Sequence, residues 1–383
     1  MESPCLVFDL DAVDRTLGLF GRYVPGLRLY YSLKANNDPT ILTHLQSKGL
    51  GFDVASVNEI GTAIAAGIAP EDMILSNTVK TTNCIREIFR RRVFATTIDN
   101  ELDLKALALE STFHSFRPQV FVRIKLQPLG VEINLNEKFG CTLERAAALL
   151  AKSHELGLPP AGVHFHVGTQ CRNVQSYRVG IESAIEVLRD VRTRHGLNLT
   201  SINIGGGFPD ELAAAEYGGL ESFITELGEI VKAAQDHGFN LIAEPGRVIA
   251  AGACTAVARV IGRNVHDGKD WLYLDDGIYG LFSTAHYEKR HFDLIPVEKK
   301  KGKAISYVVA GPTCDSLDVI SLNTMLPADM QPGDYVLANH AGAYSISVKS
   351  QFNGMGQIST AVSQQAVVSL EVPEDIKTIV GGL

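Results

Sequence analysis

Eight short segments rich in β-branched and aromatic residues, each followed by a stretch of helical character, occupy the chain up to about residue 244. We expect strands near residues 27–33, 51–55, 72–76, 93–99, 119–125, 162–168, 202–206 and 240–244. Regular alternation of strands and helices is typical of a parallel sheet, and eight such units can close into a (β/α)8 barrel. An open, doubly wound α/β sheet is the alternative, because strand spacing in a sequence does not separate the two.

Helical signals lie between these strands. Apolar residues recur at helical spacing over residues 143–150 and 176–195, where we expect helices. The run Ser56-Val57-Asn58-Glu59 has the form of a capping box, which marks a helix start. Helix ends are expected just before three glycines, because glycine adopts the left-handed backbone that closes a helix: Gly67, Gly157 and Gly238.

The pattern changes after about residue 250. Segments with strand composition follow there, separated by Gly, Pro and Asp turns without long helices between them: 255–265, 271–274, 304–310 and 334–338. A chain of 383 residues also exceeds one typical hydrophobic core. We therefore expect two domains, a barrel of residues 10–249 and a β-sandwich or β-barrel of residues 250–383, to which residues 1–9 add a strand.

Composition excludes several classes of function. The net charge of -8, without runs of like charge, argues against a nucleic-acid partner. No apolar stretch reaches the roughly 20 residues of a membrane-spanning helix. The opening Met1–Cys5 lacks the regions of a signal peptide. Six cysteines without metal-ligand spacing indicate reduced thiols, so we expect a cytoplasmic protein with no metal site.

Polar and glycine-rich residues gather where the predicted barrel strands end. Barrels of this kind keep their active sites at the carboxyl ends of the strands. Polar surface residues placed at random would not keep that register. The residues concerned are Lys34, Asp53, Arg123, His166, Gly205–Gly207 and Glu244–Arg247.

Several of these residues also have structural interpretations. The three glycines form either a loose turn or a nest of N–H groups around a phosphate. Asp53 could cap a helix, and Glu244 could pair with Arg247. His164 and His166 share a strand face and could bind a metal, but no acidic or cysteine pair completes such a site.

Lys34 is the candidate nucleophile. It closes the apolar strand Leu29–Leu33, with aromatic and aliphatic neighbours behind it. Burial disfavours the ammonium form, so an amine held there is well placed to form a Schiff base. Taken alone the signal is weak, because most lysines are solvated surface charges.

A series of motifs runs from about residue 5 to 355: YYSLKANNDP, FDVAS with Glu59, HFHVGTQ, INIGGGFP, EPGR, LDDGIYG, GPTCDSLD, GAYS and FNG. In content and order they resemble the ornithine, diaminopimelate and arginine decarboxylases of pyridoxal phosphate fold type III. The segment GPTCDSLD is similar to the ornithine decarboxylase branch, since diaminopimelate decarboxylases carry Glu after the Cys. The resemblance implies an alanine racemase-like barrel followed by a β domain.

The resemblance also implies the cofactor pyridoxal 5′-phosphate (PLP). Lys34 would hold PLP covalently, Glu244 would pair with the pyridine nitrogen, and His166 would stack on the ring. The ring and the lysine would be supported by Asp53, Glu59 and Arg123. The phosphate would be held by Gly205, Gly206, Gly207, Gly246, Arg247 and Tyr344, with Thr169 where the family often has Ser.

Further residues are implied for the substrate. Cys314, by base rates alone a small buried hydrophobe, would deliver a proton to Cα, and Asp315 would bind the distal amine. In relatives this segment reaches into the neighbouring subunit's site, which implies a homodimer with shared active sites. Ornithine decarboxylases usually carry Tyr-Asp where this chain has Tyr287-Glu288, whose carboxylate projects further. Tyr279 of the DGIYG motif would complete the substrate pocket.

The implied function is a carboxy-lyase for a basic L-amino acid, foremost L-ornithine to putrescine in polyamine biosynthesis. Alternatives are lysine, arginine, or a modified or carrier-linked amino acid of a siderophore or antibiotic pathway. A fold-type III racemase is less consistent with GPTCD, because racemases lack it and use a Tyr acid/base. An inactive binding protein of the antizyme-inhibitor type is argued against by Lys34, Glu244, Arg247 and Cys314.

Overall fold

The computed structural model describes residues 3–363 and divides into two compact units. The barrel unit comprises Arg15–Lys34 and Leu42–Val248. Within the described residues, the sheet unit comprises residues 3–14, Ala35–Ile41 and residues 249–363. Residues 1–2 and 364–383 lie outside the described part, as does that portion of the predicted domain 250–383. The segment Ala35–Ile41 falls inside the predicted range 10–249 but clusters with the sheet unit.

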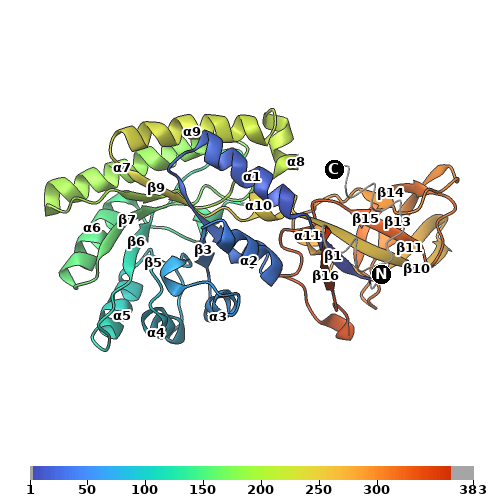
Figure 1. Cartoon of the computed structure of the whole chain (residues 1–383), viewed down its shortest axis with the longest axis horizontal. Helices are drawn as coiled ribbons and strands as arrows, with labels where there is room; N and C mark the ends of the chain where they lie inside the picture. Colours follow the sequence, from blue (N-terminus) through green and yellow to red (C-terminus); the bar gives the residue numbers. More distant parts are fainter. Residues whose placement is uncertain (1–2, 364–383) are drawn as a thin grey trace. The chain divides into compact units, whose positions relative to one another are not determined.

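Eight parallel strands close the barrel unit in sequence order, and the first pairs with the last (Figure 1). This confirms the predicted barrel and excludes the open sheet. The strands are β2 Arg28–Ser32, β3 Gly51–Val54, β4 Met73–Leu75, β5 Ala95–Ile98, β6 Gln119–Arg123, β7 Pro160–His164, β8 Ser201–Asn203 and β9 Asn240–Ala243.

Two predicted strands extend too far at their carboxyl ends. β7 ends at His164 rather than near residue 168, because His166 Nδ1 accepts a hydrogen bond from Gly168 N (2.9 Å) in the turn that follows. β8 ends at Asn203 rather than at residue 206, where Asn203 Oδ1 accepts from Gly205 N (2.9 Å). In both cases a local hydrogen bond from a backbone N–H to a polar side chain forms a turn, so the strand ends before the apolar sequence segment ends.

Helices flank the barrel strands, as Figure 1 shows for α4 to α7 and α9. Both helices predicted from periodicity are present, as α6 and α7. The helices are α1 Leu10–Tyr23, α2 Pro39–Ser47, α3 Val57–Ala65, α4 Thr82–Arg91, α5 Glu101–Ser111, α6 Leu143–Glu155, α7 Gln175–His195, α8 Glu211–Ala214, α9 Leu220–Asp236 and α10 Arg247–Ala250. Short 3₁₀ turns occur at Leu33–Ala35, Pro70–Asp72, Leu135–Glu137, Ala215–Tyr217 and Phe352–Gly354.

The helix termini largely follow the sequence signals. Ser56 caps α3 by accepting a hydrogen bond from Glu59 N (3.2 Å), as a capping box requires. The Glu59 carboxylate instead accepts from Ala55 N (2.6 Å), one residue before the expected position. The predicted glycines follow α3, α6 and α9 with φ of +88°, +74° and +84°, so left-handed glycines do close these helices.

The sheet unit holds a mostly antiparallel sheet of eight strands in the order β12-β15-β10-β11-β13-β14. β1 pairs antiparallel with β10 and parallel with β16. Of these strands the sequence did not indicate β12, β14 and β16. The elements are β1 Cys5–Phe8, β10 Cys254–His266, β11 Lys269–Leu274, β12 Leu294–Pro296, β13 Ala304–Ala310, β14 Val319–Pro327, β15 Tyr335–Ala338, β16 Ser359–Val362 and the helix α11 Ser283–Tyr287.

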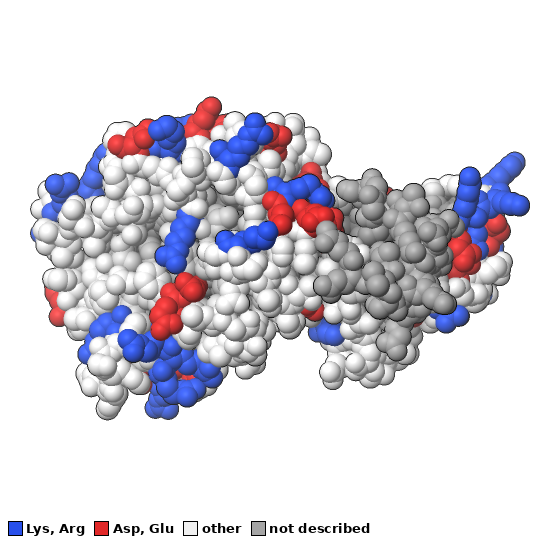
Figure 2. All heavy atoms as spheres, in the orientation of Figure 1, with Lys and Arg blue, Asp and Glu red and all other residues white. Residues whose placement is uncertain are grey.

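Charged groups of both signs lie beside one another on the face of the barrel unit in Figure 2. On α4, for example, Arg90 and Arg91 both contact Glu87, at 2.6 and 2.5 Å. Among helices of residues 3–363, none combines the length and apolar composition that crossing a bilayer demands.

Candidate active site

Lys34 lies in the 3₁₀ turn that follows β2, two residues beyond the strand. Its Nζ donates to Asp53 Oδ2 (2.7 Å) and to Ser32 Oγ (3.3 Å). The Lys34 side chain is 44% exposed, whereas that of Asp53 is 1% exposed. The Lys34 side chain is thus less buried than its apolar neighbours in the sequence suggested, and its amine is paired with a buried carboxylate.

Asp53 lies within β3, one residue before its end, and is not a helix cap, since Ser56 caps α3. Burial raises the pKa of the Asp53 carboxyl, and the charge of Lys34 opposes that shift. The Ser32 hydroxyl lies 2.8 Å from Asp53 Oδ2 and 3.2 Å from the Glu244 carbonyl oxygen. Lysine and aspartate are thus held together at the carboxyl ends of adjacent strands.

Glu244 follows β9 directly and is 4% exposed. Its Oε1 accepts from Asn203 Nδ2 (2.6 Å) and from the Ser76 hydroxyl, and its Oε2 lies 3.4 Å from His164 Nε2. Burial alone would raise the pKa of Glu244, but His164, the charge of Lys34 and the hydrogen bond from Ser76 lower that pKa well below its ordinary range. The barrel therefore holds an ionised carboxylate away from water.

The glycine loop after β8 lies directly against the turn after β7. A Cβ on Gly205 would lie 2.3 Å from Phe165 O, one on Gly206 would lie 2.6 Å from Glu244 O, and one on Gly207 would lie 2.0 Å from Gly168 O. Gly205 and Gly207 also have positive φ, +65° and +90°. Only glycine fits this close approach.

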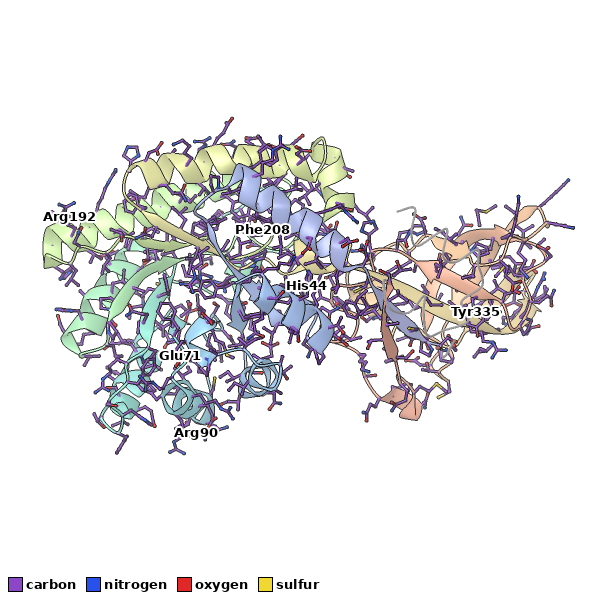
Figure 3. All side chains as sticks on the ribbon, viewed as in Figure 1. His44, Glu71, Arg90, Arg192, Phe208 and Tyr335 are labelled. Carbon is purple, nitrogen blue, oxygen red and sulfur yellow. The ribbon has the colours of Figure 1, made fainter. Side chains whose placement is uncertain are left out.

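Aromatic side chains anchor the glycine loop from behind. The Tyr177 hydroxyl donates to Gly206 O (3.0 Å), and the Tyr177 ring stacks on that of Phe208 with 5.2 Å between centroids. Phe208 is labelled among the elements of the barrel unit in Figure 3. Within residues 3–363, no acceptor bonds the backbone N–H of Gly206 or of Gly207. Those N–H groups are available to an anion, which favours the phosphate nest over the loose turn.

His166 lies two residues beyond β7 and is partly buried. Burial, helped by the charges of Arg123 and Lys34, lowers the pKa of His166 well below its ordinary value. Its Nδ1 accepts from Gly168 N, so the neutral ring carries its hydrogen on Nε2. A Cβ on Gly206 would lie 3.2 Å from that Nε2. A neutral imidazole therefore borders the glycine loop.

Arg123 is the last residue of β6 and is 6% exposed. Its guanidinium lies over the Phe139 ring, 5.0 Å from the centroid. Burial lowers the pKa of Arg123, and the charge of Glu244 opposes that shift. Among the described atoms, Arg123 Nε and Nη2 have no hydrogen-bond partner, which leaves two donors for a bound group.

The other predicted cofactor residues of the barrel unit lie in the helices and loops that follow its strands. Burial raises the pKa of Glu59 in the first turn of α3. Thr169 N donates to Ile133 O (3.0 Å), so Thr169 lies in the segment between β7 and α7. Gly246 immediately precedes α10, and Arg247 begins that helix and is 6% exposed.

The sheet unit carries the predicted substrate residues. The Tyr279 hydroxyl donates to Asp315 Oδ2, so the structure brings these two together. Cys314 is exposed, and the expectation that it is a small buried hydrophobe is wrong; its backbone N–H donates to Asn353 Oδ1 (3.1 Å). Tyr287 ends α11 and is 46% exposed.

Two further predicted residues of the sheet unit occupy turns. Glu288 follows α11, and its backbone N–H donates to Thr284 O (3.1 Å). Tyr344 has a φ of +56°, and its backbone N–H donates to Ala35 O (2.7 Å). The Ser283 hydroxyl donates to Tyr344 O (2.9 Å), which ties the start of α11 to this turn.

Sequence reasoning missed several residues that hold the predicted ones. Ser32, Ser76 and Asn203 bond Asp53 or Glu244, and Tyr177 bonds the glycine loop. Ser32, Ser76 and Asn203 lie at the carboxyl ends of barrel strands, the same signal that found Lys34. Tyr177 lies within α7 and gave no such signal.

A cavity of about 720 Å³ opens at the opposite end of the barrel unit. The first residues of five strands line it, namely Arg28, Gln119, Pro160, Ser201 and Asn240. The titratable groups described above lie at the carboxyl ends instead. The catalytic candidates and this cavity therefore belong to separate ends of the barrel.

Comparison with known proteins agrees with this arrangement. A family model described as pyridoxal-dependent decarboxylase, pyridoxal binding domain, matches residues 10–251. The chain is 31% identical to a lysine/ornithine decarboxylase of Selenomonas ruminantium, over 98% of this chain and 94% of the relative. It is 30% identical to ornithine decarboxylase 2 of Drosophila melanogaster, over 92% of this chain and 90% of the relative.

A solved structure shares the architecture. The arginine decarboxylase of Paramecium bursaria Chlorella virus, bound to agmatine, superimposes with a TM-score of 0.87 at 26% identity, covering 94% of this chain and 97% of that one.

The cofactor of the matched domain is PLP, and the barrel residues fit it. Lys34 offers an accessible amine, and Glu244 offers a buried negative charge for the pyridine nitrogen. The N–H groups of Gly206 and Gly207 can donate hydrogen bonds to the phosphate.

Proposed function

We propose, since the chain belongs to the pyridoxal-dependent decarboxylases of basic amino acids, that its substrate is L-ornithine and its product putrescine, a diamine of polyamine biosynthesis. The carboxylate of Asp315 carries the proposal. The backbone N–H of Leu317 (3.0 Å) and the Tyr279 hydroxyl lower the pKa of Asp315. An ionised, oriented carboxylate suits the distal ammonium of a diamino acid.

A second carboxylate supports the choice of ornithine. Glu288 follows α11 in the same unit as Asp315. With Glu where ornithine decarboxylases usually carry Asp, the carboxylate projects about one methylene further into the substrate space. A shorter pocket favours ornithine over the longer lysine and arginine.

The chemistry divides among the residues described. PLP, when bound, supplies the electron sink for the electron pair left as CO₂ departs. Lys34 binds the cofactor, and Asp53, 2.7 Å from Nζ, holds the lysine proton. Glu244, ionised in the barrel, would pair its negative charge with the pyridine nitrogen. Cys314, whose thiol is accessible, donates the proton to Cα of the substrate.

We also infer a homodimer in which Cys314 and Asp315 act in the neighbouring subunit's site. Exposed apolar side chains close to Cys314 in the sequence support this inference, because a second subunit could cover them. Leu317, Leu322 and Met325 are 61%, 73% and 59% exposed. Such side chains together are typical of a surface that another protein covers.

The test is CO₂ release by purified holoenzyme from L-ornithine, L-lysine and L-arginine. We expect the highest kcat/KM for ornithine, by about tenfold or more over lysine, given what one methylene discriminates. A higher kcat/KM for lysine or arginine would refute ornithine as the preferred substrate, but it would not contradict membership of the decarboxylase family. Racemisation without CO₂ would refute a decarboxylase, and a visible PLP–lysine band without any turnover would indicate an inactive binding protein.

A further inference from the structure

Two loops of the sheet unit carry the proposed substrate residues. Residues 275–281 carry Tyr279, and residues 311–318 carry Cys314 and Asp315. The buried side chain of Asp318 joins these loops. We propose that Asp318 is a positioning residue that fixes Tyr279, Cys314 and Asp315 relative to one another, an inference that rests on the proposed function.

The hydrogen bonds of Asp318 connect the two loops directly. Its side chain is buried, at 2% exposure. Oδ1 accepts from Ile278 N (2.9 Å), and Oδ2 accepts from Thr313 N (3.1 Å) and Thr313 Oγ1 (2.7 Å). Ile278 immediately precedes Tyr279, and Thr313 immediately precedes Cys314. One carboxylate therefore bonds the residue before each of two proposed substrate groups.

Two glycines make the space for this carboxylate. A Cβ on Gly277 would lie 2.0 Å from Asp318 Oδ1, and a Cβ on Gly311 would lie 2.4 Å from either carboxylate oxygen. Any larger residue at either position would displace Asp318 or its loop. The sequence thus provides a slot matched to one side chain, with a glycine from each loop.

The bonds beyond Asp318 depend on the same placement. The Tyr279 hydroxyl can donate to Asp315 only while the two loops stay in register. Ser350 N donates to Tyr279 O (2.8 Å), and Cys314 N donates to Asn353 Oδ1. Without the link at Asp318, Asp315 would lose its orientation towards a distal ammonium, and the Cys314 thiol would shift with it.

The test replaces Asp318 with Asn, which keeps the shape but turns a donating NH₂ group towards backbone N–H donors. Calorimetry on the holoenzyme would measure Kd for putrescine and for n-butylamine, which lacks the distal amine. We expect the preference for putrescine to fall by about tenfold or more, as for a poorly paired ammonium. A general structural defect would weaken both ligands equally. Asp275→Asn is the matched control, because Asp275 bonds Ser3 and Arg259 N and does not join the loops.

A second, smaller change tests the same link in case the Asp318→Asn protein does not fold. Thr313→Val removes a single hydroxyl donor, and we expect the preference for putrescine to fall several-fold. An unchanged preference in folded Asp318→Asn or in Thr313→Val, with parent-like values in the control, would overturn the role of Asp318. A parent enzyme that does not prefer putrescine to n-butylamine would overturn the proposed function, and this inference with it.

Discussion

At the scale of single residues, Glu288 offers the sharpest test of substrate length. Glu288→Asp withdraws the carboxylate by about one methylene, so the pocket should lengthen and the ranking of ornithine against lysine should change by roughly 10- to 200-fold. The measurement is kcat/KM for ornithine, lysine and arginine in both proteins. Glu298→Asp, at an exposed position of the same unit, is the control. A ranking that stays the same would mean that Glu288 does not contact the substrate.

Single residues also show where sequence reasoning reaches its limit. Lys34, Asp53 and Glu244 could be found because each lies at or beside the end of a barrel strand. Their partners depend on contacts between distant segments: Ser76 bonds a carboxylate 168 positions away. The pairing of Lys34 with Asp53 was missed for the same reason, because the carboxylate belongs to another strand.

At the scale of elements, Asn203 links two parts of the cofactor site at the end of β8. Its amide nitrogen bonds Glu244, and its amide oxygen bonds Gly205 N. Asn203→Ala should leave Glu244 short of a donor and loosen the glycine loop, which should weaken PLP binding by about tenfold or more. Fluorescence titration of apoenzyme with PLP measures the loss. The control Asn240→Ala, at the first residue of β9 and so at the other end of the barrel from Asn203, should bind PLP as the parent does. Equal PLP affinities in the parent and both variants would contradict the role of Asn203.

The loop that follows β11 should make stability depend on pH through Asp276. Burial raises the pKa of Asp276 to about 7, and its Oδ2 accepts from Leu281 N (2.7 Å). In the unfolded chain the group titrates near its ordinary value of about 4. The folded state therefore keeps a proton that the unfolded state has lost between these values. The stabilisation is complete below pH 4 and is lost as pH rises through about 7.

Asp276→Asn cannot ionise and should remove this dependence. The free energy of unfolding of the parent relative to the variant should fall by at most about 4 kcal/mol between pH 4 and pH 8. Urea unfolding at several pH values measures it. Asp293→Asn, at a carboxylate that is 92% exposed, should give a constant difference. A constant difference for Asp276→Asn as well would show that Asp276 titrates alike in the folded and unfolded chains.

Elements of the barrel were easier to predict than those of the sheet unit. Alternating strands and helices predict a barrel because each unit repeats the same pattern. All eight predicted barrel strands are present. β12 and β16 are three and four residues long, too short for a periodic signal. β14 carries exposed Leu322 and Met325, so its sequence does not alternate as a half-buried strand should.

At the scale of the whole molecule, the proposed homodimer predicts recovery of activity between two inactive proteins. Lys34→Ala removes the cofactor amine, and Cys314→Ala removes the proton donor. If sites are shared, a mixed dimer has one site with both native residues. Free exchange makes half of the dimers mixed, so activity should return to about a quarter of the parent value.

The measurement is CO₂ release from ornithine after mixing and exchange. Lys34→Ala mixed with the double variant Lys34→Ala, Cys314→Ala should recover nothing, since no native lysine is present. Exchange is followed independently by native mass spectrometry. Demonstrated exchange without recovered activity would show that Cys314 acts within its own subunit.

The six cysteines differ in burial, so that a thiol reagent should label this protein at a single residue. Cys5, Cys84, Cys141, Cys171 and Cys254 are buried, whereas Cys314 is exposed. Burial also raises the pKa of Cys141 to about 12 and that of Cys254 well above its ordinary value, so few of these thiols ionise near neutral pH. A maleimide dye added to the folded chain would attach beside Asp315 alone, and a mild oxidant would stop the enzyme by modifying the same sulfur.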